Sequence, residues 1–172
     1  MKDANKPLHL KFNMNIINYK DNLICSFLII LIFSFDRISK IKVIDNQLNN
    51  EVVYINDFIN FDLVWNTGIG FGFFSSHSSL TYNLITALIG IVIIFLIYLL
   101  IKSIFVDKVL FSLVLGGALG NFFDRLTYFA VPDFIDFHIG TIHWFTFNFA
   151  DIFISLGIFA MVIKEFILKK NT

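Results

Sequence analysis

The feature that most constrains this chain is a long apolar run, residues 80–101, that contains no charged residue. A helix rises about 1.5 Å per residue, so about 20 apolar residues are needed to cross a hydrocarbon core roughly 30 Å thick. The composition agrees with such a span, because 57% of the 172 residues are hydrophobic and only 15% are charged. Soluble domains carry about 25% charged residues. The sequence therefore predicts a mainly α membrane protein.

Three further apolar segments are shorter between charges and must use their flanks to cross. Lysine and arginine can extend their charged ends to the interface, whereas an aspartate at such a junction needs a partner or a role. We predict four transmembrane helices, preceded by a polar and poorly ordered tail at residues 1–20. The expected spans are 21–40, 80–101, 108–124 and 149–168, within a single membrane domain over residues 21–172.

The basic N-terminal tail followed by an apolar run also resembles a secretory signal peptide. No small-residue cleavage site follows the run, only Phe35, Asp36 and Arg37, so we predict an uncleaved first span. Most of the 13 lysines and arginines lie in the two tails and in the loop between the second and third spans. By the positive-inside rule these parts are cytoplasmic, as are both termini.

This orientation brings the junction aspartates Asp36, Asp124 and Asp151 to the outer face, and Asp133 and Asp136 to the outer loop 125–147. The outer segment 42–74 is too polar to span and too apolar to be a plain linker. Alternation over 52–55 and 58–65 predicts two short strands. We expect a small extracytoplasmic β-rich cap, and a short amphipathic element in the outer loop.

Other classes of site have little support in the sequence. The single cysteine, Cys25, lies in the first apolar run, so the chain can form no intrachain disulfide and has no cysteine pattern for a metal. The net charge is zero and no basic block stands out, so we expect no nucleic-acid partner.

Five short blocks resemble, in the same order, the signature blocks of the lipoprotein signal peptidase (signal peptidase II) family. The resemblance covers the chain from about residue 20 to its C-terminus, and the third and fifth blocks are long enough to make a chance match improbable. The blocks are DRISK (36–40), NTGIGFG (66–72), GGALGNFFDR (116–125), VPDF (131–134) and FNFAD (147–151).

The resemblance implies an aspartyl endopeptidase with Asp133 and Asp151 as its catalytic pair. Its substrates would be diacylglyceryl-modified prolipoproteins, cut just before the lipid-bearing cysteine, with water as the nucleophile and no cofactor or metal. It implies a multi-pass protein of the bacterial inner membrane, in contact with membrane lipids, with its active site at the outer face. We expect a monomer. The residues expected to bind substrate or support the pair are Asp36, Asn66, Gly68, Gly117, Asn121, Asp124, Arg125 and Asn148.

Two neighbouring carboxylates suit this chemistry because they cannot both ionise cheaply. They share a proton, so that one acts as a general base on water while the other acts as an acid toward the scissile carbonyl. Water can reach a pair at the outer interface while the substrate helix is still in lipid.

Structural interpretations are also open for several of these residues. Asp124 beside Arg125 fits a helix-end ion pair, and Asp36 fits a pair with Arg37 or Lys40. The glycines at 116 and 120 form a small-xxx-small step typical of close helix packing.

A metal-site hypothesis is raised by Asp136, His138 and His143, but their spacing matches no recognised ligand pattern. We therefore favour interfacial anchoring or substrate contact for these three residues. The chain also departs from the family at Ile69 and Gly70, where two alanines are usual, and at Pro132, where an aliphatic residue is usual.

Two other functions remain as alternatives. A small proton- or ion-coupled transporter subunit would use membrane carboxylates as a relay, but a relay should distribute acids along the depth of the bilayer. Here the junction acids gather at one face. A structural assembly factor would leave its polar outer residues dispensable: Asn66, Asn121, Asp133, Asn148 and Asp151.

Overall fold

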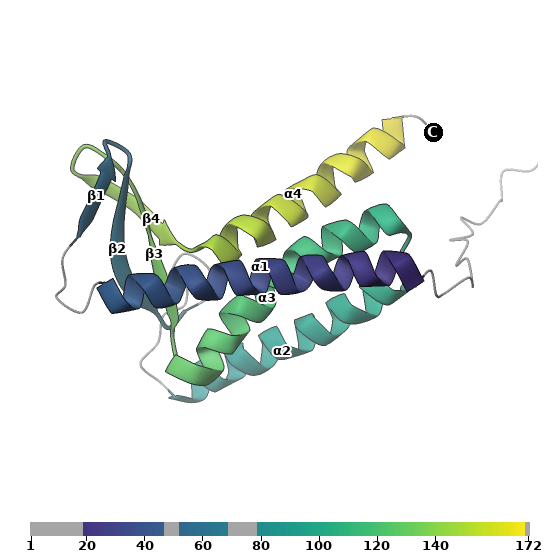
Figure 1. The fold of residues 1–172 in the computed structure, drawn as a ribbon, viewed down its shortest axis with the longest axis horizontal. Coiled ribbons are helices and arrows are strands. Elements are labelled where there is room, and N and C mark those ends of the chain that lie inside the picture. Colours follow the sequence, from purple (N-terminus) through teal and green to yellow (C-terminus); the bar gives the residue numbers. More distant parts are fainter. Residues whose placement is uncertain (1–18, 47–51, 69–78, 171–172) are drawn as a thin grey trace, which may run out of the picture.

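A computed structural model describes residues 19–46, 52–68 and 79–170 (Figure 1). The expected tail up to residue 18, and Ile69 and Gly70, lie outside the described residues. The described part is mostly helical, with one small antiparallel sheet. Its elements are α1 (Tyr19–Asn46), β1 (Val53–Asn56), β2 (Ile59–Asn66), α2 (Ser79–Lys102), α3 (Phe105–Tyr128), β3 (Val131–Ile139), β4 (Ile142–Phe147) and α4 (Phe149–Lys170).

Helix α3 is the centre of the helical bundle, because it packs against α1, α2 and α4. Glycines allow α1 and α4 to approach α3 closely. A Cβ atom added at Gly116 would lie 2.9 Å from Cβ of Ile32 on α1, and one at Gly157 would lie 2.6 Å from Val114 of α3. Such distances leave no room for a larger side chain, so the predicted packing role of Gly116 is confirmed.

Two helices, α2 and α3, are long and apolar enough to cross a membrane. Helix α2 exposes large apolar side chains along its length, including Leu84, Ile91 and Phe95. A surface this apolar suits lipid rather than water. Helices α1 and α4 are about as long, but they contain more charged residues than α2 and α3.

The four strands form one antiparallel sheet in the order β1-β2-β3-β4, which lies at one end of the helical bundle (Figure 1). The two strands predicted from alternation correspond to β1 and β2. The expectation of an amphipathic element in the outer loop was wrong, since residues 131–147 form a β-hairpin that completes the sheet. Gly140 has a φ of 61°, which suits the first position of its two-residue turn.

The sheet is fixed to the bundle through Phe134 of β3, which is 1% exposed. Its ring lies 5.6 Å from the ring of Phe61 on β2 and 5.8 Å from that of Phe149, both edge to face. Such pairs add specific geometry to apolar burial. Because Phe149 begins α4, this contact sets β3 against the first turn of that helix.

Candidate active site

The carboxyl group of Asp133 on β3 is 2% exposed and is held by two side-chain amides. Asn66, the last residue of β2, donates to its Oδ2 at 2.9 Å, and Asn148 donates to its Oδ1 at 2.6 Å. The pairing of β2 with β3 brings Asn66 and Asp133 together. Both partners are neutral, so they orient the carboxyl group without compensating its charge.

Asn148 also caps α4. Its side-chain oxygen accepts the backbone N–H of Asp151 at 3.0 Å, and its backbone N–H donates to Oδ2 of Asp151 at 3.2 Å. This reciprocal pattern is a capping box, which satisfies two of the unpaired donors at a helix start. The amide of Asn121 on α3 donates to the other oxygen of Asp151 at 2.8 Å. The cap therefore fixes Asp151 and, through the same asparagine, Asp133.

Burial, and after it the nearby Asp151 carboxylate, raise the pKa of Asp133 from its ordinary value of 3.8 to about 7. Hydrogen bonds from Asn66 and Asn148, and the charge of Lys40, oppose this rise. A carboxyl group with a pKa near neutrality can both release and take up a proton under ordinary conditions.

Asp133 and Asp151 line one cavity of about 270 Å³ between the sheet and the helices. Asn66, Asn121 and Arg125 contribute polar groups to its wall. The remaining lining residues are mainly apolar and come from α2, α3, β3 and α4: Ile89, Ala118, Val131, Ile154 and Ser155. A largely apolar pocket with a few convergent polar groups is typical of an active site.

A second group of acids surrounds Lys40, which is fully buried. We call Asp36, Arg37, Lys40 and Asp124 the Lys40 cluster. The Nζ atom of Lys40 lies 2.7 Å from Oδ2 of Asp36 and 2.7 Å from Oδ2 of Asp124. Arg37 pairs with the other oxygen of Asp124. Two acids thus meet two bases, which compensates charges that would be costly to bury alone.

The expected pairing of Asp124 with Arg125 was wrong, because Asp124 pairs with Arg37 and Lys40 on α1. Arg125 instead donates to the carbonyl oxygen of Gly68 and lies over the ring of Tyr82, 5.5 Å from its centre. It therefore fixes the end of β2 to α3. The alternative pairing of Asp36 with Lys40 is confirmed.

The Lys40 cluster is connected to the carboxylates of the cavity. Lys40 donates to the amide oxygen of Asn121 at 2.8 Å, and Asn121 in turn donates to Asp151. Asp36 accepts the backbone N–H of Ala150 in the first turn of α4 at 2.9 Å. An acid at a helix start is favoured by the helix dipole, so the cluster holds α4 by its N-terminal end.

Glycines make this connection sterically feasible. A Cβ at Gly120 would lie 2.5 Å from Oδ2 of Asp36, and one at Gly117 would lie 2.5 Å from the carbonyl oxygen of Ala150. Only the absence of a side chain lets α1, α3 and α4 meet at this point.

The structure brings together the expected site residues that it describes, around two centres. Asn66, Asn121, Asp133, Asn148 and Asp151 are joined by hydrogen bonds next to the cavity, whereas Asp36 and Asp124 belong to the Lys40 cluster. Sequence reasoning missed the central position of Lys40. The spacing of Asp36 and Lys40, four residues apart on one helix, was the available signal.

Together these features describe a mostly helical protein, with helices apolar enough to cross a membrane, in which two carboxyl groups line one cavity. The family model for signal peptidase (SPase) II matches residues 28–167. The chain belongs to this family, and its class is that of a peptidase.

Named relatives and solved structures agree. A lipoprotein signal peptidase of Pelagibacter ubique is 45% identical over 154 residues, which cover 88% of this chain and 93% of that protein. The lipoprotein signal peptidase of Anaplasma marginale is 35% identical over 85% of this chain and 86% of its own. A solved bacterial membrane enzyme superposes with a TM-score of 0.68 at 30% identity, over 91% of this chain and 92% of that one.

Proposed function

We propose that this protein is an aspartic peptidase that removes signal peptides from lipid-modified prolipoproteins, cleaving before the diacylglyceryl cysteine. The observation that carries the proposal is the convergence of Asp133 and Asp151, from a strand and a helix, on one cavity. The relatives' shared name, lipoprotein signal peptidase, supports the substrate class.

In the proposed reaction the two carboxyl groups share one proton. The ionised member takes a proton from water as the water oxygen attacks the scissile carbonyl carbon, and the protonated member donates to the carbonyl oxygen. A proton then passes to the amine as the C–N bond breaks. The pKa of about 7 for Asp133 supports this exchange near neutral pH.

The positions of the other polar residues support separate roles. Asn66, Asn121 and Asn148 orient the two carboxyl groups, whereas Asp36 and Asp124 position α4 and α3 through Lys40. Gly117 lets the first turn of α4 approach α3, and Gly68 accepts the hydrogen bond of Arg125. We propose these as positioning residues rather than catalytic ones.

A second cavity, of about 250 Å³, also borders Asp151. It is bounded by Phe145, Phe147, Ile152 and Leu156, and is almost wholly apolar. Walls of this kind suit hydrocarbon chains. We propose that it receives part of the lipid attached to the substrate cysteine, next to the bond to be cut.

We further propose that α1 and α4 also cross the membrane, giving four spans in one domain that works as a monomer in the bacterial inner membrane. Two observations support this arrangement. The start of α1 and the end of α4 both lie at the end of the bundle opposite the sheet (Figure 1), and that end carries the basic residues Lys102 and Lys169. The positive-inside rule then puts both termini in the cytoplasm and the sheet outside.

Cleavage of a lipidated prolipoprotein by the detergent-purified protein tests the peptidase proposal. We expect Asp133→Asn and Asp151→Asn each to abolish cleavage. Asp62→Asn is a matched control, since Asp62 lies on β2 and undergoes the same chemical change. If both variants cleave at the wild-type rate, the proposed catalytic pair is wrong.

The transporter alternative has no support from the relatives of Pelagibacter, Anaplasma and Francisella, which bear the name lipoprotein signal peptidase. It makes a separate prediction, namely ion flux into proteoliposomes without any proteolysis. Robust flux together with an absence of cleavage would favour it over the peptidase.

A further inference from the structure

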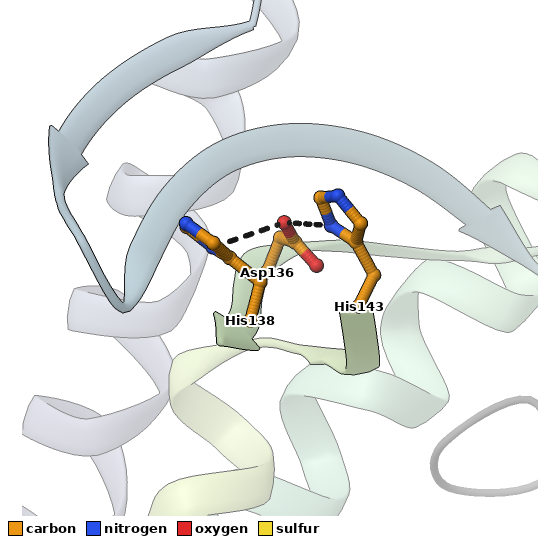
Figure 2. A group of neighbouring side chains, drawn as sticks. All are labelled: Asp136, His138 and His143. Atoms are coloured by element: carbon orange, nitrogen blue, oxygen red, sulfur yellow. Dashed lines mark hydrogen bonds and ion pairs between the residues drawn. The ribbon is translucent and has the colours of Figure 1, made fainter. Parts of the chain in front are cut away.

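A second group of side chains lies on the β3–β4 hairpin, apart from the proposed active site. Asp136 and His138 are two residues apart on β3, so strand alternation puts them on the same face. His143 on β4 is paired directly with His138 in the sheet register. Three side chains with metal-binding atoms therefore meet on one face of the hairpin, as Figure 2 shows.

The carboxylate of Asp136 lies between the two imidazole rings (Figure 2). Its Oδ2 is 2.6 Å from Nδ1 of His143 and 3.6 Å from Nδ1 of His138. In a tetrahedral zinc site with bonds of about 2.0–2.1 Å, ligand atoms lie about 3.3 Å apart. The two measured separations lie on either side of that value, and one ligand atom from each residue falls within 4.8 Å of the others. Side-chain rotations that shorten the largest separation, 4.8 Å, by about 1.5 Å would complete the geometry.

Two buried polar atoms at this group of side chains lack a hydrogen-bond partner among the described residues. The side chains of Asp136 and His138 are 5% and 8% exposed, yet Nδ1 of His138 has no hydrogen-bond partner among the described residues. Asn60 stands opposite Asp136 on β2, and its buried Oδ1 is also without a partner in the described part of the chain. Buried polar atoms of this kind normally find a partner or an ion.

We propose that Asp136, His138 and His143 form a binding site for a divalent transition-metal ion of the Zn²⁺ type. Two imidazole nitrogens and one carboxylate oxygen suit zinc, whereas Ca²⁺ and Mg²⁺ need more oxygen ligands. His143 is 59% exposed, so the ion can enter from solvent and keep water as a further ligand. The sheet register creates this site, which explains why the sequence spacing matched no ligand pattern.

The bound ion would fasten β4 to β3. Strand alternation places Asp133 on the opposite face of β3, three residues before Asp136, so the ion would lie outside the catalytic cavity. Its expected role is to brace the strand that presents Asp133. It takes no part in the proposed peptide hydrolysis, which needs only the two carboxyl groups and water.

Zinc binding to the purified protein, prepared with an affinity tag that contains no histidine, tests the proposal. Competition with a chromophoric chelator gives the affinity and stoichiometry for Zn²⁺ alone, and Co²⁺ absorption reports the coordination geometry. We expect one equivalent of Zn²⁺ per chain. His143→Ala and Asp136→Asn should each weaken binding by at least about 10- to 100-fold, the loss typical even of a residue that only supports a ligand.

Two variants serve as controls. His9→Ala removes a histidine from the N-terminal tail, and Asp133→Asn removes the proposed catalytic acid; both should bind zinc as the wild type does. Because His143 is exposed, its replacement leaves the fold intact, which circular dichroism checks. Failure of wild-type protein to bind Zn²⁺ at micromolar free concentration, or equal binding by His143→Ala, would overturn the proposal. Since binding is measured without substrate, this result is independent of the peptidase test.

Discussion

The protein holds two pairs of aspartates, Asp36 with Asp124 and Asp133 with Asp151, in different surroundings. Asp36 and Asp124 are fully buried and contact the cations of Lys40 and Arg37. Asp133 is buried almost as deeply, but its two hydrogen-bond partners are the neutral amides of Asn66 and Asn148.

We infer from this difference that the partner's charge, more than the depth of burial, would separate a supporting acid from the proposed catalytic one. A cation beside a carboxylate stabilises the ionised form and so fixes its state. A neutral amide fixes only its position, so the carboxyl group keeps a proton that it can exchange. Four predictions test this comparison, from the largest expected effect to the smallest.

Neutralising one acid from each pair should lower stability to different extents. Asp133→Asn should lower the cleavage rate by about 10²- to 10⁴-fold or more, the usual contribution of a general acid or base, and lower the melting temperature only slightly, because one of the two hydrogen bonds from Asn66 and Asn148 loses its acceptor. Asp124→Asn should lower the melting temperature, because it leaves Arg37 and Lys40 short of a partner. Cleavage assays and thermal melts of both variants provide the measurement. Equal melting temperatures would remove the distinction between the pairs.

Removing the positive charge of Lys40 should lower the stability of the fold through its effect on Asp36 and Asp124. Lys40→Met leaves two buried carboxylates and the oxygen of Asn121 without their shared donor. Breaking a buried ion pair in this way costs about 3–5 kcal/mol. Unfolding in detergent, compared with Lys42→Met on the same helix, measures the loss. A Lys40→Met protein as stable as the control would show that the cluster contributes little.

Adding one methyl group at Gly117, where the Lys40 cluster and the cavity meet, should lower both the stability and the cleavage rate. In Gly117→Ala the new Cβ would lie 2.5 Å from the carbonyl oxygen of Ala150, so the first turn of α4 must move. Overpacking of this kind costs about 1–3 kcal/mol, and a displacement of about 1 Å at Asp151 can slow the reaction by about 100-fold. The measurement pairs cleavage kinetics with thermal melts, and Gly90→Ala on α2 is the control, since its new Cβ would lie 3.4 Å from the nearest atom, on the ring of Phe122. Full activity in Gly117→Ala would contradict the close packing.

The raised pKa of Asp133 predicts a gradual loss of stability as the pH rises. In the unfolded chain this group loses its proton near pH 3.8, whereas in the folded protein it keeps the proton up to about pH 7. Between these values the folded state binds more protons, so the free energy of unfolding falls with increasing pH, by at most about 1.4 kcal/mol per pH unit. Melts from pH 4 to 8 should show this slope, flattened in Asp133→Asn. Identical profiles for the two proteins would contradict it.

The helical part of the fold could be predicted from the sequence because charge-free length is a strong signal. The run at 80–101 corresponds closely to α2, and alternation located β1 and β2. The β3–β4 hairpin was missed, although Gly140 between two alternating apolar segments is a recognised hairpin signal. Pro132 obscured it, because proline is rare inside strands, and here it stands at the second position of β3.

The candidate site could be located only in part. Junction position gathered Asp36, Asp124 and Asp151 at one end of the molecule, and the family resemblance singled out Asp133 and Asp151. Which cation meets which acid depends on how α1 packs against α3, and sequence neighbours give no information about that. The structural alternative for Asp124 therefore named the adjacent Arg125 as its partner, and Lys40, 84 residues away, was not considered. The cluster of Asp136 and the two histidines depends in the same way on strand register.

The cap of α4 links the folding of the first turn of that helix to the positions of Asp133 and Asp151. Asn148 binds Asp133 and closes the first turn around Asp151, so fraying of that single turn would remove one hydrogen-bond partner from each carboxyl group at the same time. Local openings of this size cost far less than global unfolding. A molecule that binds the frayed turn would therefore loosen the two proposed catalytic carboxyl groups together.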